Sequence, residues 1–219
     1  MVRILMADAE PLFGEDIFEN CVRLLPDVRL QKINRLKNMK DKCLSAASWF
    51  LLREGARLFD KNADVENIME QKGGKPYLVN APHIHFSISH SGNMAMCAVS
   101  LNPVGADIQH ICNFNEEICK RYFTSGECNY VMSADSASEK TARFFRIWTC
   151  KEAYSKMTGR GLFDFLNFEV AGREDKYNIV NSDDVYFHTL DLLEYKLAVC
   201  TAGKTEAEYN ELGIMSLME

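Results

Sequence analysis

This sequence has no long hydrophobic run and no apolar leader at its N-terminus. No apolar stretch approaches the ~18 residues that a membrane-spanning helix needs. The first residues are apolar, but the chain reaches Asp8 and Glu10 too soon for a secretory signal. We therefore expect a soluble, cytoplasmic protein that does not enter a membrane.

Closely spaced cysteines are also missing. There are eight cysteines, and the closest two in the sequence, Cys112 and Cys119, are seven residues apart. This spacing excludes the Cys-x-x-Cys pairs of zinc and redox sites. Cys97, Cys150 and Cys200 lie in apolar segments, where cysteine usually serves as a small buried hydrophobe. We expect neither a catalytic cysteine nor a disulfide.

An excess of basic residues is the third absence. The net charge is −6, which argues against binding along a nucleic-acid backbone, because such binding needs a basic surface. Any anionic ligand must then be held by a local group of basic residues. The clearest group lies at 35–42, where Arg35, Lys37, Lys40 and Lys42 recur. The same pattern is typical of the solvated face of a helix.

The first half of the chain predicts both helices and strands. Its 219 residues are enough for one large domain or for two small ones that share an interface. Alternation of apolar and polar residues at 83–90 is typical of a half-buried strand. The segments expected here are a strand at 2–6, helices at 16–25 and 30–59 (the latter broken near Asp41), a turn at 73–76, a strand at 83–90, a hairpin turn at 91–93, and strands at 94–100 and 104–108. Gly105 in the last strand leaves room for another backbone to approach.

The second half repeats this order of elements. Ser136 and Glu139 have the spacing of a helix capping box, and Gly159 and Gly161 are typical of a helix end. The segments expected are a helix at 115–123, a long helix from 136 to 159, and strands at 165–170, 177–180, 185–190 and 195–201. Residues 94–99 resemble residues 196–201. We therefore predict an α+β fold of two similar halves, 1–103 and 104–219, with a ligand cleft between them.

An acid and a base, Glu152 and Lys156, lie one helical turn apart within an aromatic and apolar run at 144–156. Residues four apart share a helix face, so these two could hold a metal and a phosphate together. A surface ion pair beside a core stripe is the alternative. Asp107 and Gln109 point the same way on their strand. Together with Glu152 they offer three oxygen donors, which suit Mg²⁺ and not zinc.

Several polar side chains are candidates to bind the phosphate partner of such a metal. They are Lys42, Ser45, Lys75, Ser89, His90 and Lys156. Ser89 and His90 lie at a strand end beside a turn. A structural histidine held by hydrogen bonds is the alternative for His90. Phosphoryl-type transfer needs positioning, neutralised charge and a base for the attacking hydroxyl.

Four ordered segments resemble the signature series of the 4′-phosphopantetheinyl transferases. They are Gly74-Lys75-Pro76, Phe86 to Gly92 (FSISHSG), Gly105 to Gln109 (GADIQ) and Trp148 to Lys156 (WTCKEAYSK). The resemblance spans roughly residues 1 to 202, and the length is similar to that of the Sfp-type subfamily. It implies two halves related by a pseudo-two-fold axis. It also implies transfer of the phosphopantetheine arm of coenzyme A to a serine of an acyl or peptidyl carrier protein, releasing adenosine 3′,5′-bisphosphate.

The resemblance also implies a role for each candidate residue. Asp107 and Glu152 would bind Mg²⁺ with the coenzyme A pyrophosphate, and Glu152 would be the base for the carrier serine. Lys156 would neutralise the transferring phosphate. Gln109 stands where the family often has Glu, so we expect it as a third metal ligand, with either weaker metal binding or a changed preference between Mg²⁺ and Mn²⁺. The resemblance implies that Ser89 and His90 would bind phosphates and that Lys75 would contact the nucleotide end of coenzyme A. Lys42 and Ser45 would bind the 3′-phosphate.

Two other functions stay open. One is a relative that binds coenzyme A or a carrier with weak or no transfer, which Gln109 favours. The other is a different coenzyme-A-dependent transferase, disfavoured because the sequence has no glycine-rich phosphate loop. Carrier proteins are usually acidic, as this chain is, so a local patch must dock them. We expect Lys120, Arg121, Tyr122 and Phe123 in that patch, and a monomer.

Overall fold

The computed structural model describes residues 1–173, 176–180 and 184–218, and it confirms an α+β fold. No helix in these ranges is long and apolar enough to cross a membrane. The helices are α1 (Glu15–Arg23), α2 (Asp27–Asn34), α3 (Met39–Arg57), α4 (Glu116–Tyr122), α5 (Ser125–Met132) and α6 (Ala137–Thr158), with short 3₁₀ turns η1 (Glu10–Phe13), η2 (Leu162–Asn167) and η3 (Ser216–Met218). The strands are β1 (Val2–Asp8), β2 (Ile68–Glu70), β3 (Pro76–Leu78), β4 (His85–Ser91), β5 (Met94–Ser100), β6 (Val104–His110), β7 (Val170–Arg173), β8 (Lys176–Ile179), β9 (Val185–Leu192), β10 (Tyr195–Ala202) and β11 (Ala207–Glu211).

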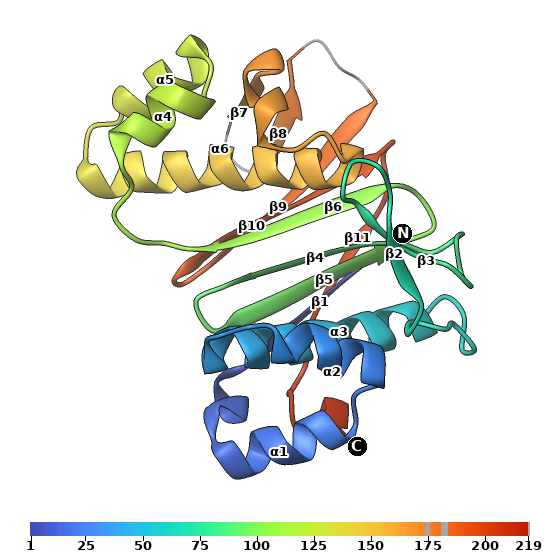
Figure 1. The fold of residues 1–219 in the computed structure, drawn as a ribbon. Coiled ribbons are helices and arrows are strands. Elements are labelled where there is room, and N and C mark those ends of the chain that lie inside the picture. The colour runs from blue at the N-terminus through green and yellow to red at the C-terminus, as the bar shows by residue number, and fades with distance from the viewer. Residues whose placement is uncertain (174–175, 181–183, 219) are drawn as a thin grey trace.

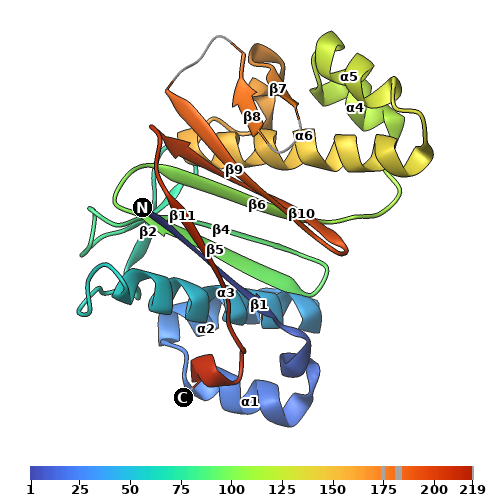
Figure 2. The same cartoon turned by 180° about the vertical axis from the view of Figure 1, so that it is seen from behind.

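Two larger sheets form the middle of the molecule. One has the strand order β11-β1-β5-β4 and the other β6-β10-β9, while β2-β3 and β7-β8 make separate hairpins. Helices α1 to α3 cover one side of this pair of sheets and α6 covers the other, with α4 and α5 beyond it (Figures 1 and 2). The order of layers is therefore helix, sheet, sheet, helix.

Three apolar cores correspond to these layers. The first lies between α1–α3 and the four-stranded sheet, and contains Phe50 and Phe86. The second lies between the three-stranded sheet and α4–α6, and contains Phe144 and Ile147. The third lies between the two sheets, where Ile4 and Met96 meet Ile108. Because each of the two sheets buries apolar side chains on both of its faces, the sheets are held at a fixed separation.

Most elements predicted for the first half are confirmed. β1, β4 and β5 occupy the expected segments, and two helices replace the long one predicted at 30–59. The break lies at 35–38 and not at Asp41, because Asn38 is extended and begins α3. The short β2 and β3 were not predicted. Each has only three residues, too few to show a periodicity.

One strand predicted for the second half is wrong. Residues 165–170 were expected to be extended, but η2 covers the first three of them and β7 begins only at Val170. The ring of Phe165 is fully buried in edge contact with Trp148 and Tyr122, so the aromatic residues here fill a core and do not alternate on a sheet. Helix α5 was also missed, although Thr124 and Glu127 make its capping box. At α6, Ser136 caps the helix as predicted, while Glu139 pairs with Arg143.

The end of the chain returns to the first half. β11 pairs in parallel with β1, and beyond it Ile214 and Leu217 are buried in the first core. A hydrogen bond of 2.5 Å from Arg53 Nη2 to the carbonyl of Leu217 fixes this end against α3. The boundary between residues 103 and 104 and the pseudo-two-fold axis stay predictions.

Candidate active site

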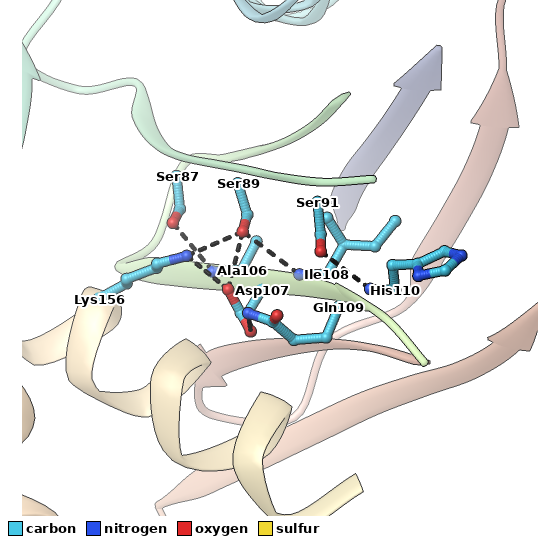
Figure 3. Close-up of polar contacts among 9 residues, drawn as sticks. All are labelled: Ser87, Ser89, Ser91, Ala106, Asp107, Ile108, Gln109, His110 and Lys156. Atoms are coloured by element: carbon cyan, nitrogen blue, oxygen red, sulfur yellow. Dashed lines mark hydrogen bonds and ion pairs between the residues drawn. The ribbon is translucent and has the colours of Figure 1, made fainter. Parts of the chain in front are cut away.

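Three serines on β4 join the two sheets. The Oγ atoms of Ser87, Ser89 and Ser91 accept backbone N–H bonds from Ala106, Ile108 and His110 on β6, at 2.9, 3.3 and 2.9 Å (Figure 3). Serine alternates with larger residues along β4, so all three hydroxyls face the same way. Along this edge of β4, the serine hydroxyls accept the N–H bonds that main-chain carbonyls would accept in a regular sheet. The two strands therefore lie side by side without forming one continuous sheet.

Asp107 lies at the centre of this seam. Its side chain is almost fully buried, and its Oδ1 accepts hydrogen bonds from Ser89 Oγ at 2.7 Å and Lys156 Nζ at 2.6 Å. Its Oδ2 accepts a bond from the amide nitrogen of Gln109 at 3.0 Å (Figure 3). Lys156 therefore pairs with Asp107 across the fold. The alternative was a surface ion pair between Glu152 and Lys156 beside a core stripe. It does not apply to Lys156, whose ion-pair partner is the buried Asp107.

Gly105 brings α6 close to β6. A Cβ added to Gly105 would stand 1.9 Å from the carbonyl oxygen of Ala153 and 2.3 Å from the nitrogen of Met157. Only glycine leaves room for this contact, as its position in the strand predicted. The close approach lets Lys156, one residue before Met157, reach the strand that carries Asp107.

The carboxyl group of Glu152 is the most strongly perturbed acid of the site. Burial and the negative charge of Asp107 raise its pKa from 4.5 to about 7, while Lys156 opposes the shift. Burial disfavours the charged carboxylate, and a second carboxylate nearby disfavours it further. Near neutral pH this group can therefore both take up and release a proton.

A cavity of about 350 Å³ lies beside these groups and is lined from both halves of the chain. Its walls are Gly73–Pro76 and Phe86–Ile88 on one side and Glu152, Ser155, Lys156, Gly159 and Gly161 on the other. The turn at Gly73 packs against the end of α6, where a Cβ on Gly73 would stand 2.4 Å from the carbonyl oxygen of Gly159. Gly159 ends α6 in the left-handed conformation, as predicted. Glu152 and Lys156 thus share one cavity.

Lys75 lines the cavity, but its ammonium group has partners within the protein. Nζ donates to the carbonyl oxygens of Met157 at 2.6 Å and Val104 at 3.3 Å. The carbonyl of Met157 lies in the last turn of α6, where a cation is favoured by the helix dipole. Burial lowers the pKa of Lys75. This lysine fastens the turn at 73–76 to α6, a role that its sequence position did not suggest.

His90, Lys42 and Ser45, which were also predicted to bind the ligand, are not among the described residues that line this cavity. His90 is exposed near the end of β4, while Lys42 and Ser45 lie on α3. A second cavity of about 580 Å³ is lined by Arg29, Lys32, Arg35 and Trp49, among others. Pro76 lines both cavities. Arg29 and Lys32 were not predicted to bind a ligand. Arg29 donates to the Ser45 carbonyl at 2.5 Å.

A fully buried ion pair supports the helix that carries Glu152. Lys151 Nζ lies 2.8 Å from Glu127 Oε1, and neither side chain is exposed to solvent. The ammonium also donates to the carbonyls of Phe165 and Phe168, at 2.6 and 2.9 Å. Glu127 accepts the backbone N–H groups of Thr124 and Val170. This ion pair was not predicted, although the spacing of Thr124 and Glu127 is that of a capping box.

Comparison with known proteins gives one consistent result. A model of the 4′-phosphopantetheinyl transferase superfamily matches residues 103–200, which include β6 and α6. The chain is 36% identical over 138 residues to a 4′-phosphopantetheinyl transferase of Bacillus subtilis, covering 60% of this chain and 61% of that protein. It is 34% identical over 138 residues to 4′-phosphopantetheinyl transferase Sfp of Bacillus subtilis strain 168, with the same two shares.

A longer alignment covers nearly all of the chain. The chain is 30% identical over 208 residues to 4′-phosphopantetheinyl transferase gsp of Aneurinibacillus migulanus, and the alignment covers 92% of the chain and 86% of that protein. The Bacillus alignments span about three fifths of those relatives' length. Taken with the seam at Asp107 and the helix of Glu152 and Lys156, these matches show that the chain belongs to the 4′-phosphopantetheinyl transferase superfamily, in its Sfp-type branch.

Proposed function

We propose that this protein transfers the 4′-phosphopantetheine arm of coenzyme A to a serine of an apo acyl or peptidyl carrier protein. The observation that carries the proposal is the pair of acids around Lys156. Asp107 forms an ion pair with Lys156, while burial and the charge of Asp107 raise the pKa of the nearby Glu152 to about 7. Two carboxyl groups in such different environments suit two roles, one of binding charge and one of moving a proton. The cavity between them and the turn at 73–76 would receive the substrate.

The donors present fit Mg²⁺. Among the described residues no three His, Cys, Asp or Glu side chains form a metal cluster. The donors of this proposal are two carboxylates, Asp107 and Glu152, and the amide of Gln109. Asp107 disfavours the ionised form of Glu152, and a cation between the two would relieve that repulsion. Two carboxylates that leave room for water and phosphate oxygens suit a hard octahedral ion. When bound there, Mg²⁺ would screen the negative charge of the coenzyme A pyrophosphate.

Glu152 is the base in this proposal. Its carboxylate accepts the proton of the carrier serine, and a base with a pKa near the working pH is effective at this task. The serine oxygen bonds to the phosphorus that carries the pantetheine arm. The bond from that phosphorus to the bridging oxygen breaks, and adenosine 3′,5′-bisphosphate leaves. Lys156 neutralises the charge on the transferring group, as cations do in phosphoryl transfer.

The remaining contacts hold coenzyme A in place. Ser89 and His90 would contact phosphate oxygens at the end of β4. Lys75 would contact the nucleotide end of coenzyme A from the turn at 73–76, which it fastens to α6. Lys42 and Ser45 on α3 would contact the 3′-phosphate, with Arg29 beside them. A monomer in the cytoplasm remains the expected state.

Binding of coenzyme A or a carrier with weak or no transfer is the second candidate function. The observation that favours it is the hydrogen bond from the Gln109 amide to Asp107, because a nitrogen stands where a metal would need an oxygen. Rotation of the amide by half a turn presents that oxygen instead. We therefore place transfer first.

Intact-protein mass spectrometry tests the function. The purified protein is mixed with coenzyme A, Mg²⁺ and a panel of apo carrier proteins, with a chelator in the control. A metal-dependent gain of one phosphopantetheine on the carrier establishes transfer and ranks the carriers from fatty-acid, polyketide and nonribosomal-peptide systems. No gain on any carrier, with coenzyme A bound in calorimetry, would select the second function.

Gln109→Glu should retain transfer and bind Mg²⁺ roughly tenfold more tightly, because affinity for hard cations rises with the number of charged ligands. Calorimetric titration with Mg²⁺ and with Mn²⁺ measures the affinity. Gln109→Ala serves as the comparison, since it removes the side-chain oxygen without adding charge. Inactivation by Gln109→Glu would mean that the position does not tolerate a ligand carboxylate.

Lys120→Glu combined with Arg121→Glu should raise the apparent KM for the carrier at least about fivefold at low salt and leave that for coenzyme A unchanged. Both residues are exposed on α4, and their charge reversal would repel an acidic partner. Phe123 cannot take part in docking as expected, because it is buried and stacks on Phe144. Steady-state kinetics with each substrate varied separate the two KM values. An unchanged carrier KM would place docking elsewhere.

A further inference from the structure

We propose that Cys119 and Cys128 form an oxidation site, at which a reversible disulfide joins α4 to α5. The two sulfur atoms lie 2.9 Å apart. Cys119 lies in the middle of α4 and Cys128 in the first half of α5, and the turn between the helices brings them together. In sequence they are nine residues apart and form no recognisable pair, and both are free cysteines in this structure.

Access to solvent distinguishes these two cysteines from the rest. Cys128 is partly exposed, while Cys119 beside it is buried. Of the other six, five are buried and only Cys112 is exposed. A soluble oxidant can therefore reach Cys112 and Cys128. Of these two, Cys128 has a second thiol in contact with it.

The environment also fixes the order of the two chemical steps. Burial raises the pKa of the Cys119 thiol, and the neighbouring Cys128 raises it further. Thiolate is the reactive form of cysteine, so Cys119 is the poorer initial nucleophile. Cys128 reacts with the oxidant first, and Cys119 then attacks the oxidised sulfur of Cys128 to form the disulfide. The two sulfur atoms are already so close that this second step needs no large movement.

Hydrogen peroxide is an oxidant that supports this chemistry. The Cys128 sulfur attacks one peroxide oxygen, an S–O bond forms, the O–O bond breaks, and the departing hydroxide takes up a proton as water. The Cys119 sulfur then attacks the sulfenic sulfur of Cys128, the S–S bond forms and the S–O bond breaks. A second water leaves with the remaining protons, so two thiols and one peroxide give one disulfide and two waters. A dithiol reductant reverses the reaction by exchange.

The link would close a short loop around the start of α5. This loop contains Thr124 and Glu127, the two residues of the capping box, and Glu127 holds Lys151 beneath the site. A cross-link of this length restricts the unfolded chain more than the folded one. The oxidised protein should therefore melt about 5 °C above the reduced protein. The inference does not depend on the proposed transferase reaction.

The test treats the full-length folded protein with hydrogen peroxide and then alkylates all remaining thiols after unfolding. Mass spectrometry should show loss of two hydrogen masses, six alkylated cysteines, and a cross-linked peptide that joins Cys119 to Cys128. A dithiol should restore eight alkylated cysteines. Oxidation of Cys128 to the sulfinic acid without cross-linking would overturn the proposal, as would a disulfide that involves Cys112.

Single variants check the order of the steps. Cys119→Ala should leave a sulfenic acid on Cys128 that a cyclic dione traps, while Cys128→Ser should leave Cys119 unreacted at the same peroxide dose. Cys112→Ser is the matched control and should form the cross-link as the parent does. If either variant fails to fold, mapping of the parent alone decides the proposal. Trapping on Cys119 in place of Cys128 would show that the assigned order is wrong.

Discussion

Replacing Glu152 by glutamine is expected to abolish phosphopantetheine transfer and, in the absence of metal, to stabilise the protein above pH 7. The first effect follows from the loss of the proposed base, which is worth roughly 10²–10⁴ in rate, together with one carboxylate of the metal site. We expect a fall of at least about 10³-fold in kcat. The carrier mass assay measures it, with Glu19→Gln, an exposed position on α1, as the control.

The second effect follows from the raised pKa of Glu152. The folded protein holds its proton more tightly than the unfolded chain, with a pKa of about 7 against 4.5. The stability gained from this is fully present below pH 4.5 and is lost as the pH rises through 7. At pH 8 the free energy of unfolding of the parent is about 2–3 kcal/mol lower than at low pH because of this carboxyl group. The Glu152→Gln variant has no carboxyl group at this position and does not show this decrease.

Thermal melts in a chelating buffer measure this difference. The variant should melt roughly 5–10 °C above the parent at pH 8, and the gap should shrink by pH 5.5. Added Mg²⁺ should stabilise the parent and leave the variant nearly unchanged, because ligand binding to the folded state alone raises stability. A variant that melts below the parent at pH 8 would contradict the placement of an unpaired carboxylate in the site. Substantial transfer by the variant would remove Glu152 from the role of base.

Local patterns in the sequence were sufficient to predict part of the site. Asp107 and Gln109 share one side of β6 because strand side chains alternate, and their hydrogen bond confirms it. Gly105 was expected to admit another backbone, and α6 is that backbone. Both predictions depend on neighbours within one strand, and a period of two is enough to make them. The alternation along β4 likewise predicted its serine face.

Pairings between distant segments could not be predicted in this way. Lys156 lies four residues from Glu152, so helix geometry alone pairs them, but Asp107 on another element lies 2.6 Å from its ammonium. Lys75 was expected to contact a nucleotide, and its hydrogen bond to the last turn of α6 was not predicted. The pairing of β11 with β1 joins the two ends of the chain. In each case the partner is set by how whole elements pack, and a local pattern carries no information about it.

The buried pair of Lys151 and Glu127 should make the largest contribution of any ion pair to stability when one partner is removed. Lys151→Met is expected to lower the free energy of unfolding by about 3–5 kcal/mol, because it leaves the Glu127 carboxylate buried without its counter-charge. The melting temperature should fall by roughly 10 °C or more. Chemical denaturation of the parent and the variant measures the change.

Lys120 provides a matched control for burial. Its ammonium lies 2.7 Å from Glu117, nearly the same distance as in the buried pair, but both side chains are more than half exposed. Lys120→Met should therefore leave the free energy of unfolding almost unchanged, because solvent and salt screen exposed pairs. Equal effects at the two lysines would mean that distance alone, and not burial, sets the cost.

A double-mutant cycle separates the ion pair from the packing of the lysine chain. Glu127→Gln keeps an oxygen for the backbone N–H of Val170 or Thr124 but removes the charge. The double variant Lys151→Met with Glu127→Gln should be more stable than the sum of the single effects by about 1.5–3 kcal/mol, since neither buried charge remains. Additive effects would indicate that Lys151 acts through its bonds to Phe165 and Phe168 alone. Because Lys151 directly precedes Glu152, the same variants should also lower kcat with little change in the KM for coenzyme A.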